Sequence, residues 1–208
     1  MFTFTQAQSN QDLDEVFRLR YQIYCLERGF EEGANHPDRR ETDEFDAHSI
    51  HFLARDESGV AVGTSRLVKD SALGLPLESQ WNISSALPGV PRSKCIEVSR
   101  MSVSKELKRP DAESAQGEIS LGLMRACYWH AKKEDLTHWC AAVERPWWLV
   151  LRRLGFNFRQ VGPPKEYHAV RIPCLTTLSE LDETMQRWRP DIFAFMQHSG
   201  IDKAPAPV

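Results

Sequence analysis

The sequence predicts a single α/β domain over residues 1–200, with a mixed β-sheet flanked by helices. The chain has 208 residues, a length that favours one domain with a sizeable core. Segments with the patterns of strands alternate along it with segments that have the 3.6-residue period of amphipathic helices. Residues 201–208 include Ala-Pro-Ala-Pro, so we expect them to form a disordered tail.

The first part of the chain predicts a strand, a long helix, a charged loop and a β-hairpin. Ser9 followed by Asp12 is typical of a capped helix start. Gly59 lies in a short turn between two β-rich runs, which is the pattern of a hairpin. The expected ranges are strand 2–7, a helix from the Ser9 cap to about Arg28, loop 29–47, and strands 50–55 and 60–68.

The second part predicts an irregular segment followed by alternating strands and helices. Prolines and glycines interrupt 69–94, which we therefore expect to be irregular. Ile119, Leu123 and Ala126 then recur at helical spacing. The expected elements are strand 95–104, helix 117–134, strand 138–143, helix 146–154, strands 156–161 and 167–174, and helix 177–188.

Composition excludes several classes of function. A formal net charge of −3 gives the whole molecule no electrostatic footprint for nucleic acid. No run approaches the roughly 18 apolar residues that a membrane span needs, and the first residues lack the features of a signal peptide, so we expect a cytoplasmic protein. The five cysteines are scattered without a Cys-x-x-Cys pair, which argues against a metal site or a disulfide framework.

The first helix places two charges on its apolar side. On a helical projection, Arg20 and Glu27 lie near the middle of an arc that includes Val16 and Ile23. A buried guanidinium without partners costs several kcal/mol, so Arg20 must meet a carboxylate or line a wet cavity. Two interpretations stay open at this point: a salt bridge that only stabilises the fold, or a grip on the carboxylate of a ligand.

Three further groups of charged residues follow. Four acids crowd the stretch Glu41–Asp46, where like charges repel unless cations or a cationic substrate are present; a solvated loop is the other interpretation. Strand alternation places Arg66 on a partly apolar face. Glu97 and Arg100 lie three residues apart in a predicted strand, so regular pleating would point them to opposite faces. Either a bulge re-aims one of them or each has a partner of its own.

In order and approximate spacing, these groups resemble the motifs of the acyl-homoserine-lactone (autoinducer) synthases. Residues 12–104 are more similar still to the acyltransferases associated with PEP-CTERM/exosortase systems. The resemblance implies the GNAT fold, whose mixed central sheet is splayed in the middle where the acyl donor lies. Those synthases usually have phenylalanine where this chain has Tyr24 and tryptophan where it has Phe30, which leaves the use of S-adenosylmethionine open. The matching residues are Arg20, Tyr24, Phe30, Asp43, Asp46, Arg66, Glu97 and Arg100.

The resemblance also implies an N-acyltransferase that moves a fatty acyl group from a thioester to the amine of an amino-acid-like acceptor. Such aminolysis needs a base for the amine and dipoles for the oxyanion. We expect Glu97 to be the base and backbone N–H groups along Glu97–Met101 to bind the oxyanion. The predicted catalytic residues are Glu97, Ser99 and Arg100. The predicted substrate-binding residues are Arg20, Tyr24, Phe30, Asp43, Asp46, Arg66, Trp81, Met101, Val103 and Trp147, with the aromatic ones lining an acyl channel or simply forming core.

The expected donor is an acyl-phosphopantetheine, with no tightly bound cofactor. Segment Lys105–Glu118 contains only Gly117 and lacks the glycine-rich loop that cradles the pyrophosphate of CoA, which favours acyl carrier protein over CoA. Two alternatives stay open: a CoA-dependent GNAT acetyltransferase and a non-catalytic acyl-binding module. Basic residues that suit docking of an acidic carrier protein are Lys105, Lys108, Arg109, Lys132, Lys133, Arg152 and Arg153.

Overall fold

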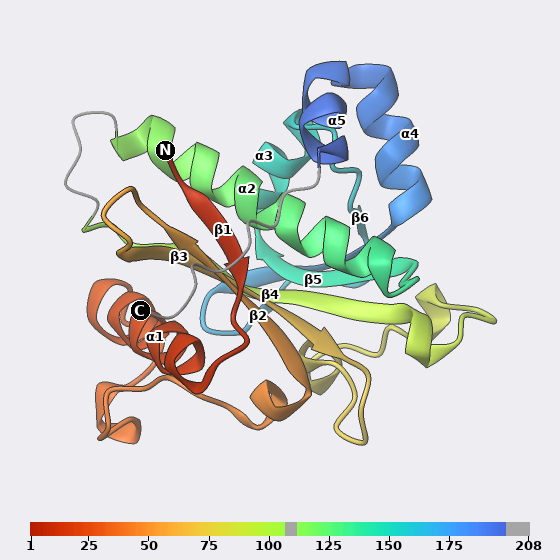
Figure 1. Cartoon of the computed structure of the whole chain (residues 1–208). Coiled ribbons are helices and arrows are strands. Elements are labelled where there is room, and N and C mark those ends of the chain that lie inside the picture. The colour runs from red at the N-terminus through yellow and green to blue at the C-terminus, as the bar shows by residue number, and fades with distance from the viewer. Residues whose placement is uncertain (107–111, 199–208) are drawn as a thin grey trace. The chain divides into compact units, whose positions relative to one another are not determined.

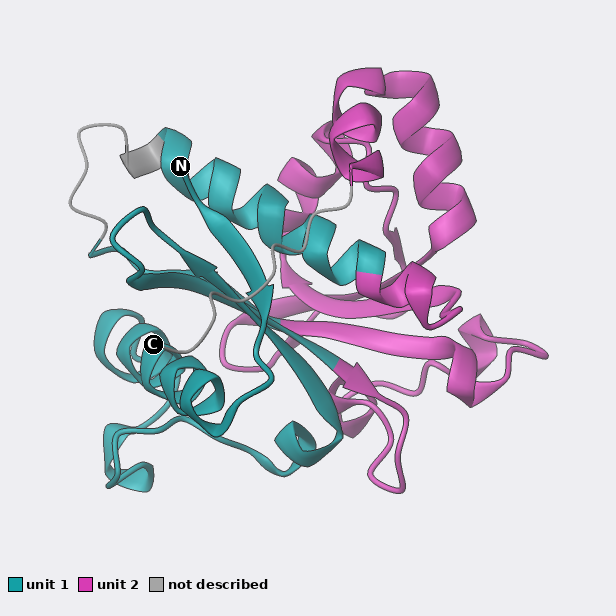
Figure 2. Ribbon diagram, in the orientation of Figure 1, with its two compact units in different colours: residues 1–67, 100–129, 200–208 teal, residues 68–99, 130–199 magenta. Residues whose placement is uncertain are grey.

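The computed structural model describes residues 1–106 and 112–198, which divide into two compact units (Figure 2). The described residues of unit 1 fall within Met1–Leu67 and Arg100–Trp129, and those of unit 2 within Val68–Ser99 and His130–Ser199. The chain passes between the units within two strands and one helix. The predictions for the tail at 201–208 and for Lys108 and Arg109 concern residues outside the described part.

Unit 1 contains the opening helix and one end of the sheet (Figure 1). Its strands follow the order β1-β2-β3-β4, and β1 pairs antiparallel with β2. The last residues of β3, the first of β4 and the end of α2 belong to unit 2. The elements are β1 (Thr3–Gln6), α1 (Asn10–Arg20), a π-helix (Tyr21–Glu27), β2 (Ser49–Arg55), β3 (Ala61–Lys69), β4 (Cys95–Val103) and α2 (Ala112–Lys133).

The predicted cap begins α1. The amide of Asp12 donates to Ser9 Oγ at 3.0 Å, and the amide of Ser9 donates to Asp12 Oδ2 at 3.1 Å. The apolar side of the helix packs against Leu53 of β2. On the other face of the unit 1 strands, Gly63 lets α2 approach closely, because a Cβ there would lie 2.7 Å from Ile119 Cγ2. The two helices thus bury opposite faces of this half of the sheet.

Unit 2 contains the other half of the sheet and the C-terminal helices. Its strands follow the order β4-β5-β8-β6, with β7 also paired to β8. The β4–β5 pair is parallel and the others are antiparallel, which confirms the predicted mixed sheet. The elements beyond β4 and the end of α2 are β5 (His138–Glu144), α3 (Arg145–Arg153), β6 (Arg159–Gln160), β7 (Lys165–Glu166), β8 (Val170–Thr177), α4 (Leu178–Trp188) and α5 (Pro190–Gln197).

The sheet opens within unit 2 beside Glu97. The parallel pairing of β4 with β5 runs from Cys95↔His138 only as far as Glu97↔Cys140. Strand β5 nevertheless continues to pair with β8 as far as Glu144↔Arg171. Strand β4 therefore leaves β5 after Glu97, as the predicted splay of the central sheet requires.

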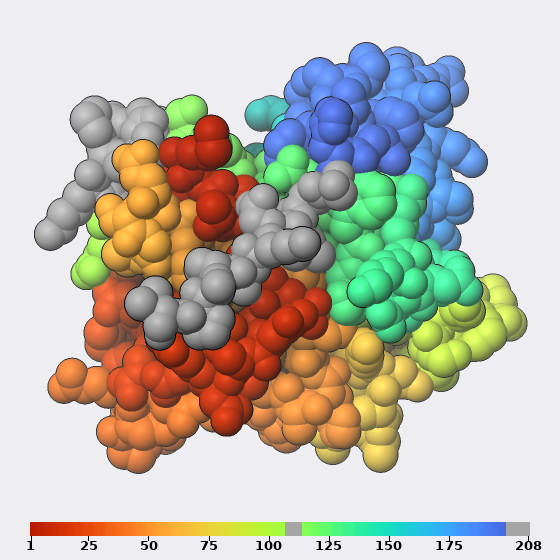
Figure 3. Space-filling view, viewed as in Figure 1, coloured from red at the N-terminus to blue at the C-terminus, as the bar shows by residue number. Residues whose placement is uncertain are grey.

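The segment before β4 is irregular, as predicted. It contains short 3-10 turns and covers the sheet with the buried side chains of Leu75, Leu77 and Trp81, which pack with Cys95 and Cys140. Elsewhere in the unit, α4 and α5 pack against each other, and their atoms form one continuous blue surface in Figure 3. None of the helices in the described part of the chain combines the length and the hydrophobicity needed to cross a bilayer.

Several predicted boundaries were wrong. The last strand is displaced by three residues, because Tyr167 and Ala169 form a tight turn around His168, whose φ is +59°. The strand predicted at 156–161 has only two paired residues, and helix α2 begins at Ala112 rather than 117. Helix α5 was not predicted. The predicted length of the first helix was correct, but its last turns are π-helical.

Candidate functional site

Arg20 ends α1 with its side chain 0% exposed. Its Nε donates to Glu41 Oε2 at 2.5 Å and its Nη1 donates to Asp46 Oδ1 at 2.6 Å. The loop that carries Glu41 is itself tied to the helix, since the Glu41 amide donates to the carbonyl of Phe17 at 3.0 Å. The expectation that Arg20 points inward and meets carboxylates is confirmed.

Arg66 of β3 is also buried and reaches the same group of acids. Its Nη1 donates to Asp43 Oδ1 at 2.6 Å and to Asp46 Oδ1 at 2.7 Å. The spacing of these acids has a local cause, because they cap the 3-10 turn Glu44–His48. Asp43 accepts from the Phe45 amide at 3.0 Å, and Asp46 accepts from the Asp43 amide at 2.8 Å. The turn therefore orients both carboxylates through contacts that do not involve the arginines.

The backbone of β4 departs from a regular strand at Arg100, three residues after Glu97. The φ of Arg100 is +47°, a left-handed conformation that costs a non-glycine residue roughly 1–2 kcal/mol and interrupts the regular pleat of β4. The side chain turns to Glu41, with Nη2 2.9 Å from Oε1, and to Asp43 Oδ2 at 3.3 Å. Its guanidinium carbon also lies 5.3 Å from the centroid of the Tyr24 ring. These charge-assisted contacts offset the backbone strain.

Together these side chains form a group of three arginines and three carboxylates within unit 1, which we call the ion cluster. Burial alone would raise the pKa of Glu41, but the charges of Arg20 and Arg100 hold it at about 2. Burial acts in the same way on Asp46, where Arg20 and Arg66 keep the pKa below its ordinary value. The members of the ion cluster are Arg20, Glu41, Asp43, Asp46, Arg66 and Arg100.

His51 lies beside this cluster in a buried position. Its Nε2 is 3.7 Å from Asp46 Oδ1, and its ring meets the Phe17 ring edge-on at a centroid distance of 5.5 Å. Burial lowers the pKa of His51 to about 4, and the charges of Arg20 and Arg66 act in the same direction. His51 is therefore neutral at physiological pH, unlike the charged side chains around it.

Several buried polar atoms next to the cluster have no hydrogen-bond partner among the described protein residues. They are Nη2 of Arg20, both ring nitrogens of His51, Thr64 Oγ1 and Ser102 Oγ. Thr64 and Ser102 lie two residues from Arg66 and Arg100 on their strands. Buried polar groups of this kind are ordinarily satisfied by water or by a ligand. This side of unit 1 therefore has the polarity to receive a small polar molecule.

We expect the free energy of unfolding to fall as the pH is lowered from about 7 to about 3. His51 and Glu41 both have a folded-state pKa below the ordinary value, so the unfolded chain binds their protons more tightly. Stability is lost for His51 as the pH falls from 6.5 towards about 4, and for Glu41 as it falls from 4.5 towards about 2. Urea denaturation at a series of pH values measures this. In His51→Leu, which cannot titrate, the upper part of the loss should become smaller; burial also lowers the pKa of His130 and the pKa of His138, so some of it remains. An unchanged profile would contradict the assignment.

The aromatic pair Tyr24 and Phe30 lies at the edge of the ion cluster. Their ring centroids are 6.4 Å apart, and the Phe30 amide donates to the carbonyl of Tyr24 at 2.8 Å. Glu31 follows and approaches Arg100 at 3.5 Å. Strand β4 continues beyond Arg100 with the half-buried Met101 and the buried Val103. Unit 1 thus contains nine of the predicted site residues, and seven of them are linked by direct contacts.

The other predicted site residues lie in unit 2. Glu97 is 3% exposed, and its Oε2 accepts from the Leu77 amide at 2.8 Å. Trp81 belongs to the buried cluster that includes Leu77, and its Nε1 donates to the carbonyl of Pro163 at 2.8 Å. Ser99 is half-buried in β4, and Trp147 is half-buried on α3. Trp81 is thus held as part of the core, the plainer of the two roles expected for it.

Sequence reasoning did not single out Glu41 as a site residue, although the acidic stretch that contains it was noted. It is 1% exposed and contacts both Arg20 and Arg100. The balance of charges could have indicated it. Three inward-pointing arginines need about three carboxylates, and the predicted pair Asp43 and Asp46 supplies only two. The described residues contain no group of three or more His, Cys, Asp or Glu side chains arranged to bind a metal.

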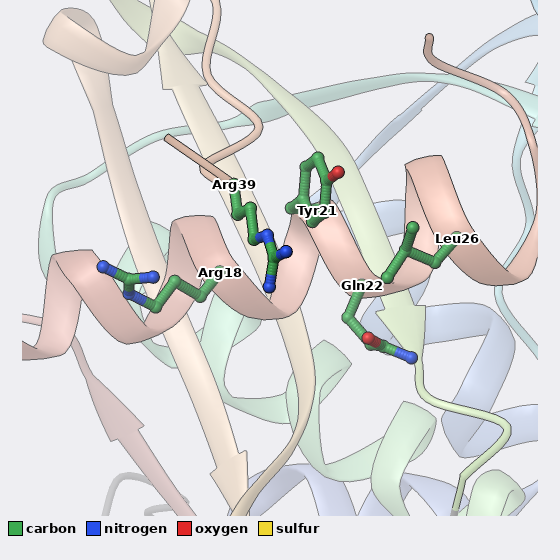
Figure 4. A pocket seen from close by; sticks show the side chains of 5 residues that line it. All are labelled: Arg18, Tyr21, Gln22, Leu26 and Arg39. Atoms are coloured by element: carbon green, nitrogen blue, oxygen red, sulfur yellow. The ribbon is translucent and has the colours of Figure 1, made fainter. Parts of the chain in front are cut away.

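An open recess of about 350 Å³ lies on the outer side of α1 and the π-helix (Figure 4). Arg39 extends towards the helix there, and Tyr21 and Leu26 line other parts of the wall. None of the lining residues belongs to the ion cluster or to the predicted site. The lining residues are Arg18, Tyr21, Gln22, Leu26 and Arg39.

Comparison with known proteins agrees with this architecture. Residues 19–115 match the model of the acetyltransferase (GNAT) domain. That range contains the whole ion cluster, Glu97 and the strand β4 on which Glu97 and Arg100 lie.

Solved structures of acyl-transferring enzymes share the fold. BjaI, a CoA-dependent acyl-homoserine lactone synthase solved with SAM and isopentyl-CoA, is 21% identical with a TM-score of 0.69, covering 100% of this chain and 95% of its own. FeeM, an N-acyl amino acid synthase from uncultured soil microbes, is 19% identical with a TM-score of 0.63, covering 88% and 94%. The AHL synthase LasI is 16% identical with a TM-score of 0.63, covering 99% and 98%. This chain therefore has the GNAT fold that these synthases share.

Proposed function

We propose that this protein is an N-acyltransferase that transfers a fatty acyl group from an acyl carrier protein thioester to the amine of an amino-acid-like acceptor. The observation that carries the proposal is the parting of β4 from β5 directly after Glu97. A thioester placed against the freed part of β4 would meet backbone N–H groups that no longer pair with β5. The likeness to an N-acyl amino acid synthase and to two acyl-homoserine lactone synthases supports the same chemistry.

In this mechanism the amine nitrogen attacks the carbonyl carbon of the thioester. Glu97 takes the proton that the amine loses, directly or through a water, and backbone N–H groups of β4 stabilise the oxyanion. The carbon–sulfur bond then breaks, which releases the phosphopantetheine thiol and leaves an amide product. The carboxylate of Glu97 is buried and already oriented by the Leu77 amide, as a positioned base requires.

We assign the ion cluster two roles in this function. Its first role is to hold Arg100 in the left-handed conformation. This conformation determines the direction of β4 immediately after Ser99 and three residues after Glu97. Its second role is to offer acceptor contacts, because one guanidinium nitrogen of Arg20 has no hydrogen-bond partner among the described residues. A carboxylate on the acceptor would match that nitrogen.

The donor has two candidates. Carrier protein is favoured by the absence of a glycine-rich cradle after β4, and the exposed Arg152 and Arg153 of α3 would suit an acidic partner. Acyl-CoA is favoured by the likeness to BjaI, which was solved with isopentyl-CoA. Both donors present the same phosphopantetheine arm, so the chemistry at Glu97 is common to them.

Mass spectrometry of reaction products tests the proposal. Purified protein is incubated with carrier proteins and CoA charged with acyl chains of several lengths, together with pooled amino acids. We expect a new amide product and an equal amount of free thiol, with faster turnover from the carrier-protein donors. Faster turnover from acyl-CoA would contradict the carrier protein as the donor and identify acyl-CoA instead. Neither product nor thiol above a heat-denatured control, with any donor, would refute an acyltransferase.

A further inference from the structure

Glu27, the last residue of the π-helix, reaches the end of β4. Its Oε1 accepts from the hydroxyl of Ser104 at 2.6 Å, and its Oε2 accepts from the backbone amide of Lys105 at 2.8 Å. Both donors directly follow the last residue of β4, Val103. One carboxylate therefore holds two successive residues where the strand ends.

The π-helix determines where this carboxylate points. The Arg28 amide donates to the carbonyl of Ile23 at 3.0 Å, a bond across five residues instead of four. A wider turn rotates the residues that follow it relative to a regular α-helix. Glu27 had been expected near the middle of the apolar side, and instead it is half-buried against a polar turn. Short π-helical segments are rare and often occur at functional sites.

The turn beyond β4 is built around Ser104. Its amide donates to the carbonyl of Val62 at 2.9 Å, which continues the pairing with β3. Its hydroxyl donates to Glu27 and accepts from the Glu106 amide at 3.1 Å. Loss of the carboxylate would leave the Lys105 amide and the buried Ser104 hydroxyl without this acceptor, so the turn depends on Glu27.

The helix that carries Glu27 also carries contacts of the ion cluster. Arg20 lies seven residues earlier and binds Glu41 and Asp46, and Tyr24 lies three residues earlier and faces Arg100. Strand β4 is thus held at Arg100 by the ion cluster and at its end by Glu27. The helical segment takes part in both attachments, through the Tyr24 ring beside Arg100 and through Glu27 at the end of the strand.

We propose that Glu27 is a positioning residue that sets the C-terminal part of β4 for the acyl donor. The inference rests on the proposed function, in which the phosphopantetheine arm of the donor lies along the freed part of β4. Glu27 touches neither substrate in this scheme. It acts through Ser104 and Lys105, so its loss should weaken the donor complex and leave the acceptor complex nearly unchanged.

Steady-state kinetics with an acyl carrier protein donor and a fixed amino-acid acceptor test this role. In Glu27→Ala we expect the KM for the donor to rise roughly tenfold or more, the effect of one lost hydrogen bond to a charged group. The kcat and the acceptor KM should stay within about twofold. Glu27→Gln keeps one side-chain oxygen and should lie between. The matched control is Glu32→Ala, an exposed glutamate of the same unit, which should behave as the wild type.

Hydrogen exchange of the peptide that contains Lys105 and Glu106 provides a readout independent of activity. We expect faster exchange in Glu27→Ala than in the wild type and in Glu32→Ala. Unchanged exchange, or a fall in kcat with both KM values altered and a lower melting temperature, would refute the positioning role. A wild type that transfers no acyl group at all would refute the proposed function instead, while faster exchange in Glu27→Ala would still establish the tether.

Discussion

Replacing Arg20 with alanine is expected to lower the free energy of unfolding by about 3–5 kcal/mol, the usual result of breaking a buried ion pair. The ion cluster has equal numbers of arginines and carboxylates, and Arg20 is 0% exposed. After its loss, Arg66 and Arg100 must balance three carboxylates, two of which, Glu41 and Asp46, are almost completely buried. Urea denaturation at about pH 7, where these carboxylates are ionised, measures the change.

Arg18→Ala is the matched control for this prediction. Arg18 lies half a turn away on the same helix, but its side chain is 57% exposed and forms its ion pair with Asp14, at 2.7 Å. An exposed pair of this kind contributes roughly 0–1 kcal/mol to the free energy of unfolding, so its loss should change stability very little. If the two variants unfolded at the same urea concentration, Arg20 would contribute no more to the stability of the fold than an exposed arginine does.

The inward-pointing charges could be predicted from the sequence because periodicity fixes the face on which a side chain lies. The helical period places Arg20 on the apolar side of α1, and strand alternation places Arg66 on a partly apolar face. Both side chains are buried. The capping pattern of Ser9 and Asp12 also located the helix start correctly, since both groups lie within one turn.

Other features depend on contacts between distant segments and leave no local pattern. The left-handed conformation of Arg100 is stabilised by Glu41, which lies 59 residues away in the chain. From the sequence alone, a bulge that re-aims Glu97 or Arg100 and a separate partner for each of them therefore both remained open. The π-helical turns at Tyr21–Glu27 are a similar case, because the short hydrogen bonds of Glu27 come from Ser104 and Lys105, almost 80 residues away in the chain, and its bond from Gln22 within the helix is long, at 3.5 Å.

Replacing Glu97 with glutamine is expected to lower kcat by about 10²–10⁴-fold, the usual contribution of a general base. Glutamine has nearly the same shape, and its amide oxygen can still accept from the Leu77 amide that now binds Glu97 at 2.8 Å. The fold and the affinity for the acyl donor should therefore be retained, and only proton removal is lost. Single-turnover rates and donor binding, measured on the same preparation, separate these two quantities.

Glu183→Gln removes the same charge from an exposed position on α4 and should leave the rate unchanged. Near-normal turnover in Glu97→Gln would remove Glu97 from the mechanism, because a base cannot be lost without effect while the acceptor amine arrives protonated. A second comparison separates proton removal from mere packing. Hydroxylamine is largely neutral at the pH of the assay, so it needs no base before it attacks the thioester. The defect of Glu97→Gln should therefore be much smaller with hydroxylamine than with an amino acid, whereas a packing defect would slow both acceptors equally.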